Sequence, residues 1–336
     1  MHLNDLFPEE GLNTLREMLQ GRHINLCFGA GVDSTAMVVA LKHIGIKPGC
    51  ITFADTGAEK TATHAHISKM QALLQTWGWP AISIVKKWTL DSTGYTDLYG
   101  ECIKNNSLPS LAFGMKACSQ KWKTQVQDGF LMGVKRGPNK QDAHTMWLDA
   151  RKTNSKIIKL IGYDCGKADI KRSGKISNDD ELFEFVYPLQ ILGWSRPECV
   201  QAITEALGAA YVPVKSACFF CPASKEWELY WLAAHEPELL EKALFLERNA
   251  LTGKHSRLDE VTFGNDWEAQ ISSGDRFPSK KTTVGLGRGF SWNQWAVTSD
   301  IVDAEFKVYR TPDKVLQFIH DASKRRKDDN ALDVRS

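Results

Sequence analysis

Two groups of residues in this 336-residue sequence have types and spacings suited to chemistry. The first is a small-residue turn between an apolar run and an amphipathic run, Phe28-Gly29-Ala30-Gly31-Val32-Asp33-Ser34-Thr35. A strand that enters a helix through such a turn presents backbone N–H groups and the positive end of the helix to an anion. The turn is not a Walker motif, because no lysine precedes Ser34, and it is not a GxGxxG fingerprint. It predicts a phosphate-binding loop.

The second group is found among the eight cysteines. Cys27, Cys50 and Cys199 fall in apolar or periodic segments, which is typical of small core residues. Cys218-Phe219-Phe220-Cys221 has the spacing at which two thiolates reach one metal ion or cluster. The alternative is that these are two neighbouring thiols with a structural role.

Elements of the right kind surround the turn. Short apolar runs predict five strands, at 23–28, 50–54, 81–85, 157–162 and 183–187. Amphipathic runs predict helices at 12–19, 34–43, 61–77, 121–130, 141–151, 197–207 and 225–249, the last broken at Glu236-Pro237. Strands that alternate with helices of this length predict an α/β fold with a parallel sheet. We therefore expect the turn to follow the first strand of that sheet.

The charge and its distribution are less specific. The net charge is +2, but Lys and Arg outnumber the acidic residues between Lys116 and Lys175. This stretch is either a solvated helical surface or a surface that meets the phosphates of a nucleotide or a nucleic acid. No apolar run is long enough to cross a membrane, and no secretory signal is visible at the start, so we expect a cytoplasmic protein without a membrane partner.

The small-residue turn resembles the PP-loop, Ser-Gly-Gly-x-Asp-Ser, with Gly29 and Ala30 in place of the usual Ser and Gly. Asp55-Thr56-Gly57 resembles the Asp-Thr-Gly element of the phosphoadenylyl-sulfate (PAPS) reductase branch. Tyr187-Pro188-Leu189 with Trp194 is similar to that branch's Pro-Leu-x-x-Trp segment. The chain thus resembles the PP-loop adenine nucleotide α-hydrolase superfamily, PAPS reductase-like family. The resemblance implies a Rossmann-like sheet with helices on both faces.

The same resemblance implies roles for particular residues. The loop, residues 28–35, would hold the phosphates of ATP with Mg²⁺, or the phosphosulfate of PAPS, with Asp33 and Ser34 facing the reacting group. Asp55, Thr56 and Gly57 would lie beside the nucleoside. In the family an arginine that follows the fourth strand meets the nucleotide. Arg172 or Lys171 is the candidate here, with surface charge as the alternative.

A further likeness concerns the cysteines. The segment 117–123 resembles the Cys-(Cys/Thr)-x-x-x-Lys segment of iron–sulfur members, which adds Cys118 to Cys218 and Cys221 as metal ligands. Because Ser119 stands where a fourth ligand is expected, the set implies either a three-cysteine [4Fe–4S] cluster or a zinc or iron–sulfur site completed by Cys102 or Cys165. Lys116, Lys121 and Lys215 are expected to stabilise the thiolates.

Three functions remain open at this stage. The first is an ATP-dependent enzyme that adenylates an acceptor, a small molecule or a tRNA or DNA, for sulfur transfer with a sulfur donor or partner protein. The second is a thiol-dependent PAPS reductase that releases sulfite, but no cysteine follows Cys221 to serve as its C-terminal nucleophile. The third is a non-catalytic nucleotide-binding module of a defence or modification complex. We expect a nucleotide-binding domain at 1–215 and a mostly helical, CxxC-containing region at 216–336 with a disordered basic tail.

Overall fold

The computed structural model describes residues 3–113, 117–134, 140–176, 180–252, 285–287 and 290–309. Its five strands are β1 (His23–Cys27), β2 (Cys50–Asp55), β3 (Ile82–Lys86), β4 (Ile157–Ile161) and β5 (Phe183–Val186). They form one all-parallel sheet in the order β3-β2-β1-β4-β5. The expected α/β, Rossmann-like fold is confirmed. The expected basic tail lies outside the described residues.

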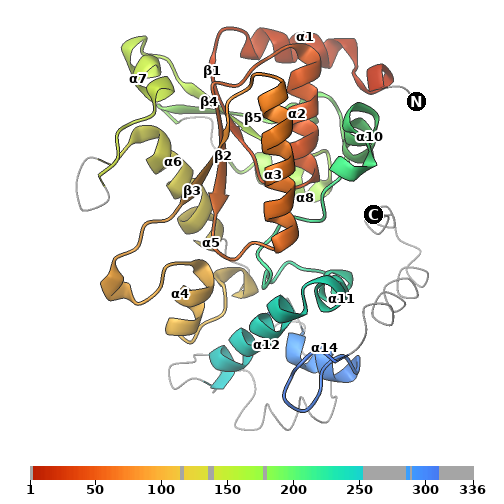
Figure 1. Cartoon of the computed structure of the whole chain (residues 1–336). Coiled ribbons are helices and arrows are strands. Elements are labelled where there is room, and N and C mark those ends of the chain that lie inside the picture. Colours follow the sequence, from red (N-terminus) through yellow and green to blue (C-terminus); the bar gives the residue numbers. More distant parts are fainter. Residues whose placement is uncertain are drawn as a thin grey trace.

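Helices cover both faces of the sheet (Figure 1). The longer ones are α1 (Glu9–Leu19), α2 (Val32–Ile44), α3 (Thr61–Thr76), α6 (Gln125–Met132), α7 (Thr145–Lys152), α10 (Arg196–Leu207), α11 (Glu226–His235) and α12 (Pro237–Thr252). The shorter ones that matter for the site are α4 (Leu98–Lys104), α5 (Ala117–Ser119), η4 (Gln120–Thr124), α8 (Lys167–Ser173), α9 (Pro188–Ile191) and α14 (Trp292–Thr298). One core packs α1, α2, α3, α9 and α10 against the sheet, and a smaller one packs α6 and α7 against the other face.

A second large core lies beyond the carboxyl ends of the strands (Figure 1). It joins α11, α12 and α14 to residues of α4 and η4, so segments from both halves of the sequence build it. Trp122 of η4 and Phe220 of the CxxC loop are fully buried there. The expected boundary at residue 215 remains a prediction.

Two expected elements differ from the structure. The helix predicted at 141–151 begins at Thr145, because Gln141 forms a β-bridge with Val134 and His144 caps the helix. The helix predicted at 121–130 is part of a longer run, α5–η4–α6, from Ala117 to Met132. Its middle, η4, is a π-helical turn, a rare departure that occurs often at functional sites.

Among the described residues, no helix is both long enough and apolar enough to cross a membrane.

Candidate functional site

The small-residue turn lies at the point where the strand order reverses. The chain runs outward from β1 through β2 to β3 and then returns to β4 on the other side of β1. In open parallel sheets, ligands bind at the carboxyl ends of the strands beside such a reversal. Phe28 leaves β1 with its N–H bonded to the carbonyl of Thr52, and α2 starts at Val32. The fold therefore places the predicted phosphate loop where nucleotide sites form.

The backbone of the loop is held in an unusual conformation. Ala30 has φ +54°, in the left-handed region that glycine adopts without strain. Gly31 caps α2, and its N–H donates to the Ser34 hydroxyl, which donates in turn to the Gly31 carbonyl, both over 3.1 Å. A Cβ on Gly31 would lie 2.7 Å from the Ser216 hydroxyl, so a side chain there would meet the segment before the CxxC.

Only part of this loop can contact a ligand through side chains. Phe28, Ala30, Val32 and Thr35 are buried. The Thr35 hydroxyl lies 2.9 Å from His66 Nε2 on α3, and burial lowers the pKa of His66 to about 4. The imidazole is therefore neutral at pH 7 and contacts the loop through the Thr35 hydroxyl.

A pocket of about 280 Å³ opens in front of the loop. Its lining residues come from the ends of β1, β2 and β4, from the loop, and from the α5–η4–α6 run: Cys27, Phe28, Gly29, Gly31, Asp33, Ser34, Phe53, Ala54, Lys123, Gln127, Ile161, Gly162, Tyr163 and Ser216. The Tyr163 ring stacks on Tyr187 with centroids 5.6 Å apart. Burial raises the pKa of the Cys27 thiol to about 11, so it is uncharged there. The pocket thus combines N–H donors, one lysine and three aromatic side chains, those of Phe28, Phe53 and Tyr163.

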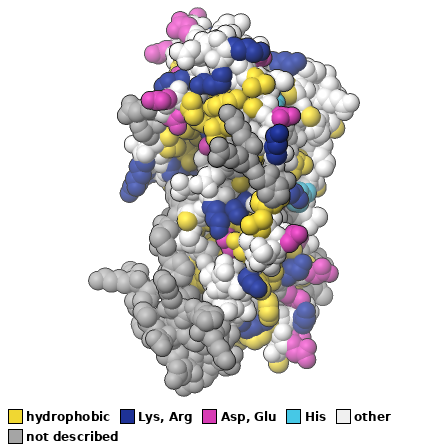
Figure 2. All heavy atoms as spheres, turned by 90° about the vertical axis from the view of Figure 1, so that its left-hand side faces the viewer, with side chains coloured by type: hydrophobic (Ala, Val, Ile, Leu, Met, Phe, Trp, Pro, Cys, Tyr) yellow, Lys and Arg dark blue, Asp and Glu magenta, His cyan; other side chains and the backbone are white. Residues whose placement is uncertain are grey.

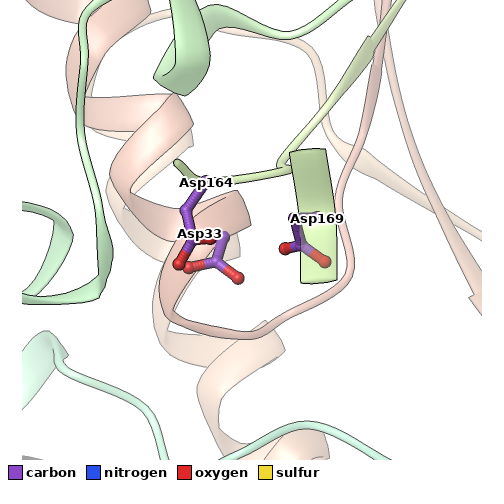
Figure 3. Close-up of side chains that lie close together, drawn as sticks. All are labelled: Asp33, Asp164 and Asp169. Carbon is purple, nitrogen blue, oxygen red and sulfur yellow. The ribbon is translucent and has the colours of Figure 1, made fainter. Parts of the chain in front are cut away.

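Charged groups gather at one side of the loop. Asp33 comes from α2, whereas Asp164 and Asp169 follow β4, and their carboxylates face a common point (Figure 3). The Arg196 guanidinium, at the start of α10, is 3.1 Å from Asp33 and 4.0 Å from Asp164. Carboxylate oxygens are ligands that Mg²⁺ accepts, and Arg196 already balances part of their charge.

Among the described residues, Arg196 thus contacts the loop directly through Asp33. Arg172 pairs with Asp169 of the same carboxylate group over 2.5 Å, and its role at the nucleotide remains a prediction. Sequence reasoning missed Arg196, although it lies two residues after Trp194 and begins a helix. That position alone carries no signal, because only the packing of α10 on α2 brings the two together.

The Asp-Thr-Gly element forms a tight turn at the end of β2. The Asp55 carboxylate accepts from the Gly57 N–H over 2.8 Å, and Thr56 Oγ1 donates to Glu59 over 3.1 Å. Gly57 has φ +71°, and a Cβ there would lie 2.4 Å from the Asp97 side chain. Glycine is required at this position for both reasons.

The CxxC loop docks directly on this turn. Glu59 and Cys218 form an antiparallel bridge, and the Phe219 N–H donates to the Ala58 carbonyl over 2.9 Å. The Thr56 hydroxyl lies 3.3 Å from Cys218 Sγ. We call this group, Thr56, Glu59, Lys123, Cys218 and Cys221, the cysteine corner. It places the predicted thiol pair beside the predicted nucleoside element.

Lys123 is the cation of the cysteine corner. Its Nζ is 3.4 Å from Glu59 Oε1, and it also lines the pocket in front of the phosphate loop. Burial disfavours its charge, but Glu59 and the two thiols outweigh burial and raise the pKa of Lys123. Burial, followed by the Glu59 charge, raises the pKa of Cys218, while Lys123 opposes that rise. Of the expected cations, Lys215 pairs with Glu228 but also opposes the rise that burial causes in the pKa of Cys221. Lys121 pairs with Glu101, and Lys116 lies outside the described residues.

The third expected ligand, Cys118, belongs to the same core but has other neighbours. It begins the α5–η4–α6 run, its N–H donates to Ser110, and it lies near Cys102, whose pKa burial raises to about 12. Cys165 is on the β4 side, 3.9 Å from the Leu189 carbonyl. Of the two expected fourth ligands, Cys102 is therefore the neighbour of Cys118.

The spacing of the sulfurs bears on the metal. A tetrahedral zinc ion holds its thiolates about 3.8 Å apart, given Zn–S bonds of about 2.3 Å. Among the described residues, Cys118, Cys218 and Cys221 do not form a group with all sulfurs within 4.8 Å. At least one pair of these sulfurs is therefore farther apart than in a zinc site. Both a zinc ion and an iron–sulfur cluster remain predictions for these cysteines.

Comparison with known proteins adds no family: no protein-family model matches the chain, and a search of curated proteins found no match.

Proposed function

We propose that this chain is a PP-loop enzyme of the PAPS reductase-like type that binds ATP and adenylates an acceptor for sulfur transfer. The observation that carries the proposal is the meeting of two sites at one edge of the sheet. The phosphate loop and the cysteine corner share Lys123, and the corner contacts the Asp-Thr-Gly turn through the Thr56–Cys218 pair. A nucleotide held on the loop would therefore have thiols beside it.

The backbone of the loop and the N-terminus of α2 would bind the phosphates, because their N–H groups and the helix dipole favour anions. Lys123 lines the pocket and Arg196 is 3.1 Å from Asp33 of its lining, so both would neutralise phosphate charge. Asp33 and Asp164 would hold Mg²⁺, which supplies further neutralisation of the leaving diphosphate. The aromatic face of Tyr163 is available to a nucleoside.

In the reaction, an oxygen of the acceptor attacks the α-phosphorus of ATP. The bond from that phosphorus to the oxygen bridging to the β-phosphate breaks, and diphosphate leaves. A sulfide ion supplied by the sulfur donor then attacks the carbon that bears the adenylated oxygen. The bond between that carbon and oxygen breaks, AMP leaves with the oxygen, and the sulfur stays on the carbon. Cys118, Cys218 and Cys221 would hold the cluster that binds the incoming sulfur.

The test follows nucleotide binding, diphosphate release and sulfite release in parallel with anaerobically purified protein. We expect Mg²⁺–ATP to bind, and diphosphate to appear when a pool of tRNA or single-stranded DNA is added. Asp33→Asn should weaken ATP binding about tenfold or more, because it disturbs both the Arg196 contact and the carboxylate group. Asp149→Asn, on the exposed side of α7, is the matched control and should leave binding unchanged.

Two other results would overturn this proposal. Sulfite release from PAPS with a thiol donor, without diphosphate from ATP, would establish the reductase. Nucleotide binding with neither product, across tRNA, DNA and small-molecule acceptors, would establish the non-catalytic module.

A further inference from the structure

A second hollow lies on the other side of the helical run that bears Lys123. Its volume is about 520 Å³, and it is lined by the end of β3 and the residues after it, 84–88, and by residues of η4 and α6. We call it the outer groove. Lys123 and Gln127 face the phosphate pocket, whereas Lys121 and Gln125 face the outer groove. The two hollows are therefore separated by one helix.

The outer groove carries an excess of positive charge. Lys86, Lys87 and Lys121 line it, and the carboxylates paired with them are Asp55, 3.1 Å from Lys86, and Glu101, which contacts Lys121. The ammonium of Lys87 lies 4.8 Å from the Trp122 ring centroid. Burial and the neighbouring Lys121 lower the pKa of Lys87. An incoming phosphate would relieve this repulsion.

Apolar side chains lie open beside these lysines. Trp88, which lines the outer groove, is 44% exposed, and Ile84 and Leu90 next to it are 51% and 50% exposed. Figure 2 views the molecule from the side of β3 and α6 and shows hydrophobic and basic side chains adjoining on that face. An exposed aromatic with cations around it is the arrangement on which proteins stack the bases of single-stranded nucleic acids.

Two observations favour a nucleic-acid strand over a protein as the occupant. Lysine is depleted in the centres of protein–protein interfaces, whereas three lysines line the same hollow as Trp88 here. A hollow of this size accepts one or two unstacked nucleotides but has no room for a duplex. The charge and the aromatic face are thus complementary to a single strand.

The outer groove adjoins the candidate site across one helical run and through one ion pair. Lys86 of the groove is 3.1 Å from Asp55, which begins the turn on which Cys218 docks. This link is the reason to identify a strand bound in the groove as the acceptor.

We propose that the outer groove binds single-stranded nucleic acid, with a base stacked on Trp88 and phosphates held by Lys86, Lys87 and Lys121, and that this strand is the acceptor. The identification as acceptor rests on the function proposed above, whereas strand binding does not depend on it.

The test measures fluorescence anisotropy of labelled 15-nucleotide oligo-dT and oligo-U in the absence of ATP. We expect both to bind, and Trp88→Ala to weaken binding about tenfold, since stacking is worth about 1–3 kcal/mol per base. Trp88→Phe should keep most of the affinity. Lys87→Gln and Lys121→Gln should each lower the slope of log affinity against log salt concentration by about one, as expected for the loss of one phosphate contact.

Matched controls are Phe245→Ala, an equally exposed aromatic on α12, and Lys152→Gln, an exposed lysine on α7, neither of which should change binding. ATP binding is measured on the same variants and should be unchanged by Trp88→Ala. Strand binding without diphosphate release would overturn the proposed function but would leave the proposal of strand binding in the outer groove standing.

The proposal is overturned if neither strand binds, if duplex binds as well as single strands, or if Trp88→Ala binds like the native chain. It is also overturned if Trp88→Ala converts a dimer into a monomer in light scattering without changing strand affinity, because the patch would then belong to a second copy of the chain.

Discussion

The phosphate loop and the cysteine corner meet at one edge of the sheet but are built in different ways. The loop is one continuous segment, residues 28–35, whose strand, turn and helix follow one another in the chain. The cysteine corner joins the end of β2 to a loop 162 residues later through the Thr56–Cys218 contact. A local segment carries its own signal, whereas a site made of distant segments depends on the packing between them.

The two regions also differ in what holds their conformation. In the loop, the backbone is strained at Ala30, and the neutral His66 contacts the loop through Thr35. In the cysteine corner, the constraint is electrostatic, because Glu59 is buried and balanced by Lys123. Changes in the two regions should therefore be separable by experiment.

The largest expected effect is on metal content and concerns only the cysteine corner. If Cys118, Cys218 and Cys221 hold the cluster proposed above, anaerobically purified protein should contain about four irons with matching sulfide. Cys218→Ala should remove nearly all of it. Cys199→Ala, a buried cysteine of the other core, should keep it. Stoichiometric zinc, or no metal, would reduce the corner to a structural contact.

The next effect is on the turn that receives the CxxC loop. Gly57→Ala should lower the free energy of unfolding by about 2–4 kcal/mol, because it adds left-handed strain to a clash with Asp97. Gly78→Ala isolates the strain, since Gly78 has φ +64° and open space around it, and should cost about 1 kcal/mol. Equal losses of unfolding free energy in Gly57→Ala and Gly78→Ala, measured by urea denaturation, would show that the turn does not pack closely against Asp97 at the start of α4.

The pH dependence of the free energy of unfolding should report on His66, which contacts Thr35 of the phosphate loop. The pKa of His66 is about 4 in the folded chain, below the ordinary value of 6.5, so the unfolded chain binds more protons between these values. Stability should therefore fall as the pH drops from about 6.5 to 4, by up to about 3 kcal/mol from this group. The free energy of unfolding, measured by denaturation at pH 7.5 and 5, should change less with pH in His66→Gln than in the native chain. His64→Gln, exposed on the same helix, should behave like the native chain.

The smallest effect concerns the strained residue of the loop. Ala30→Gly should relieve the left-handed conformation and raise the free energy of unfolding by less than about 1 kcal/mol, because glycine also gains freedom in the unfolded chain. Ala62→Gly on α3 is the opposite control and should destabilise by about 1 kcal/mol. A loss of stability in Ala30→Gly would mean that the loop needs the methyl group more than the relaxed backbone.

The sequence predicted the five strands and their α/β class, since period, length and glycine turns are local properties. It missed α8 in the stretch after β4, where a short polar helix has no apolar period. It also counted Lys159 as part of a basic stretch, but this lysine is buried in β4 and paired with Asp128. Burial of a charge depends on a partner, and the partner is not near in the chain.

By itself, the sequence determined the strand–turn–helix unit of the phosphate loop, because glycines, a helix start and a buried strand occur within about a dozen residues. Only the tertiary structure decided that Arg196 faces Asp33, that Lys123 is the cation of the cysteine corner, and that Cys218 docks on Thr56. The physical reason is that these contacts follow from helix packing and sheet order, which bring together residues separated by up to 163 positions.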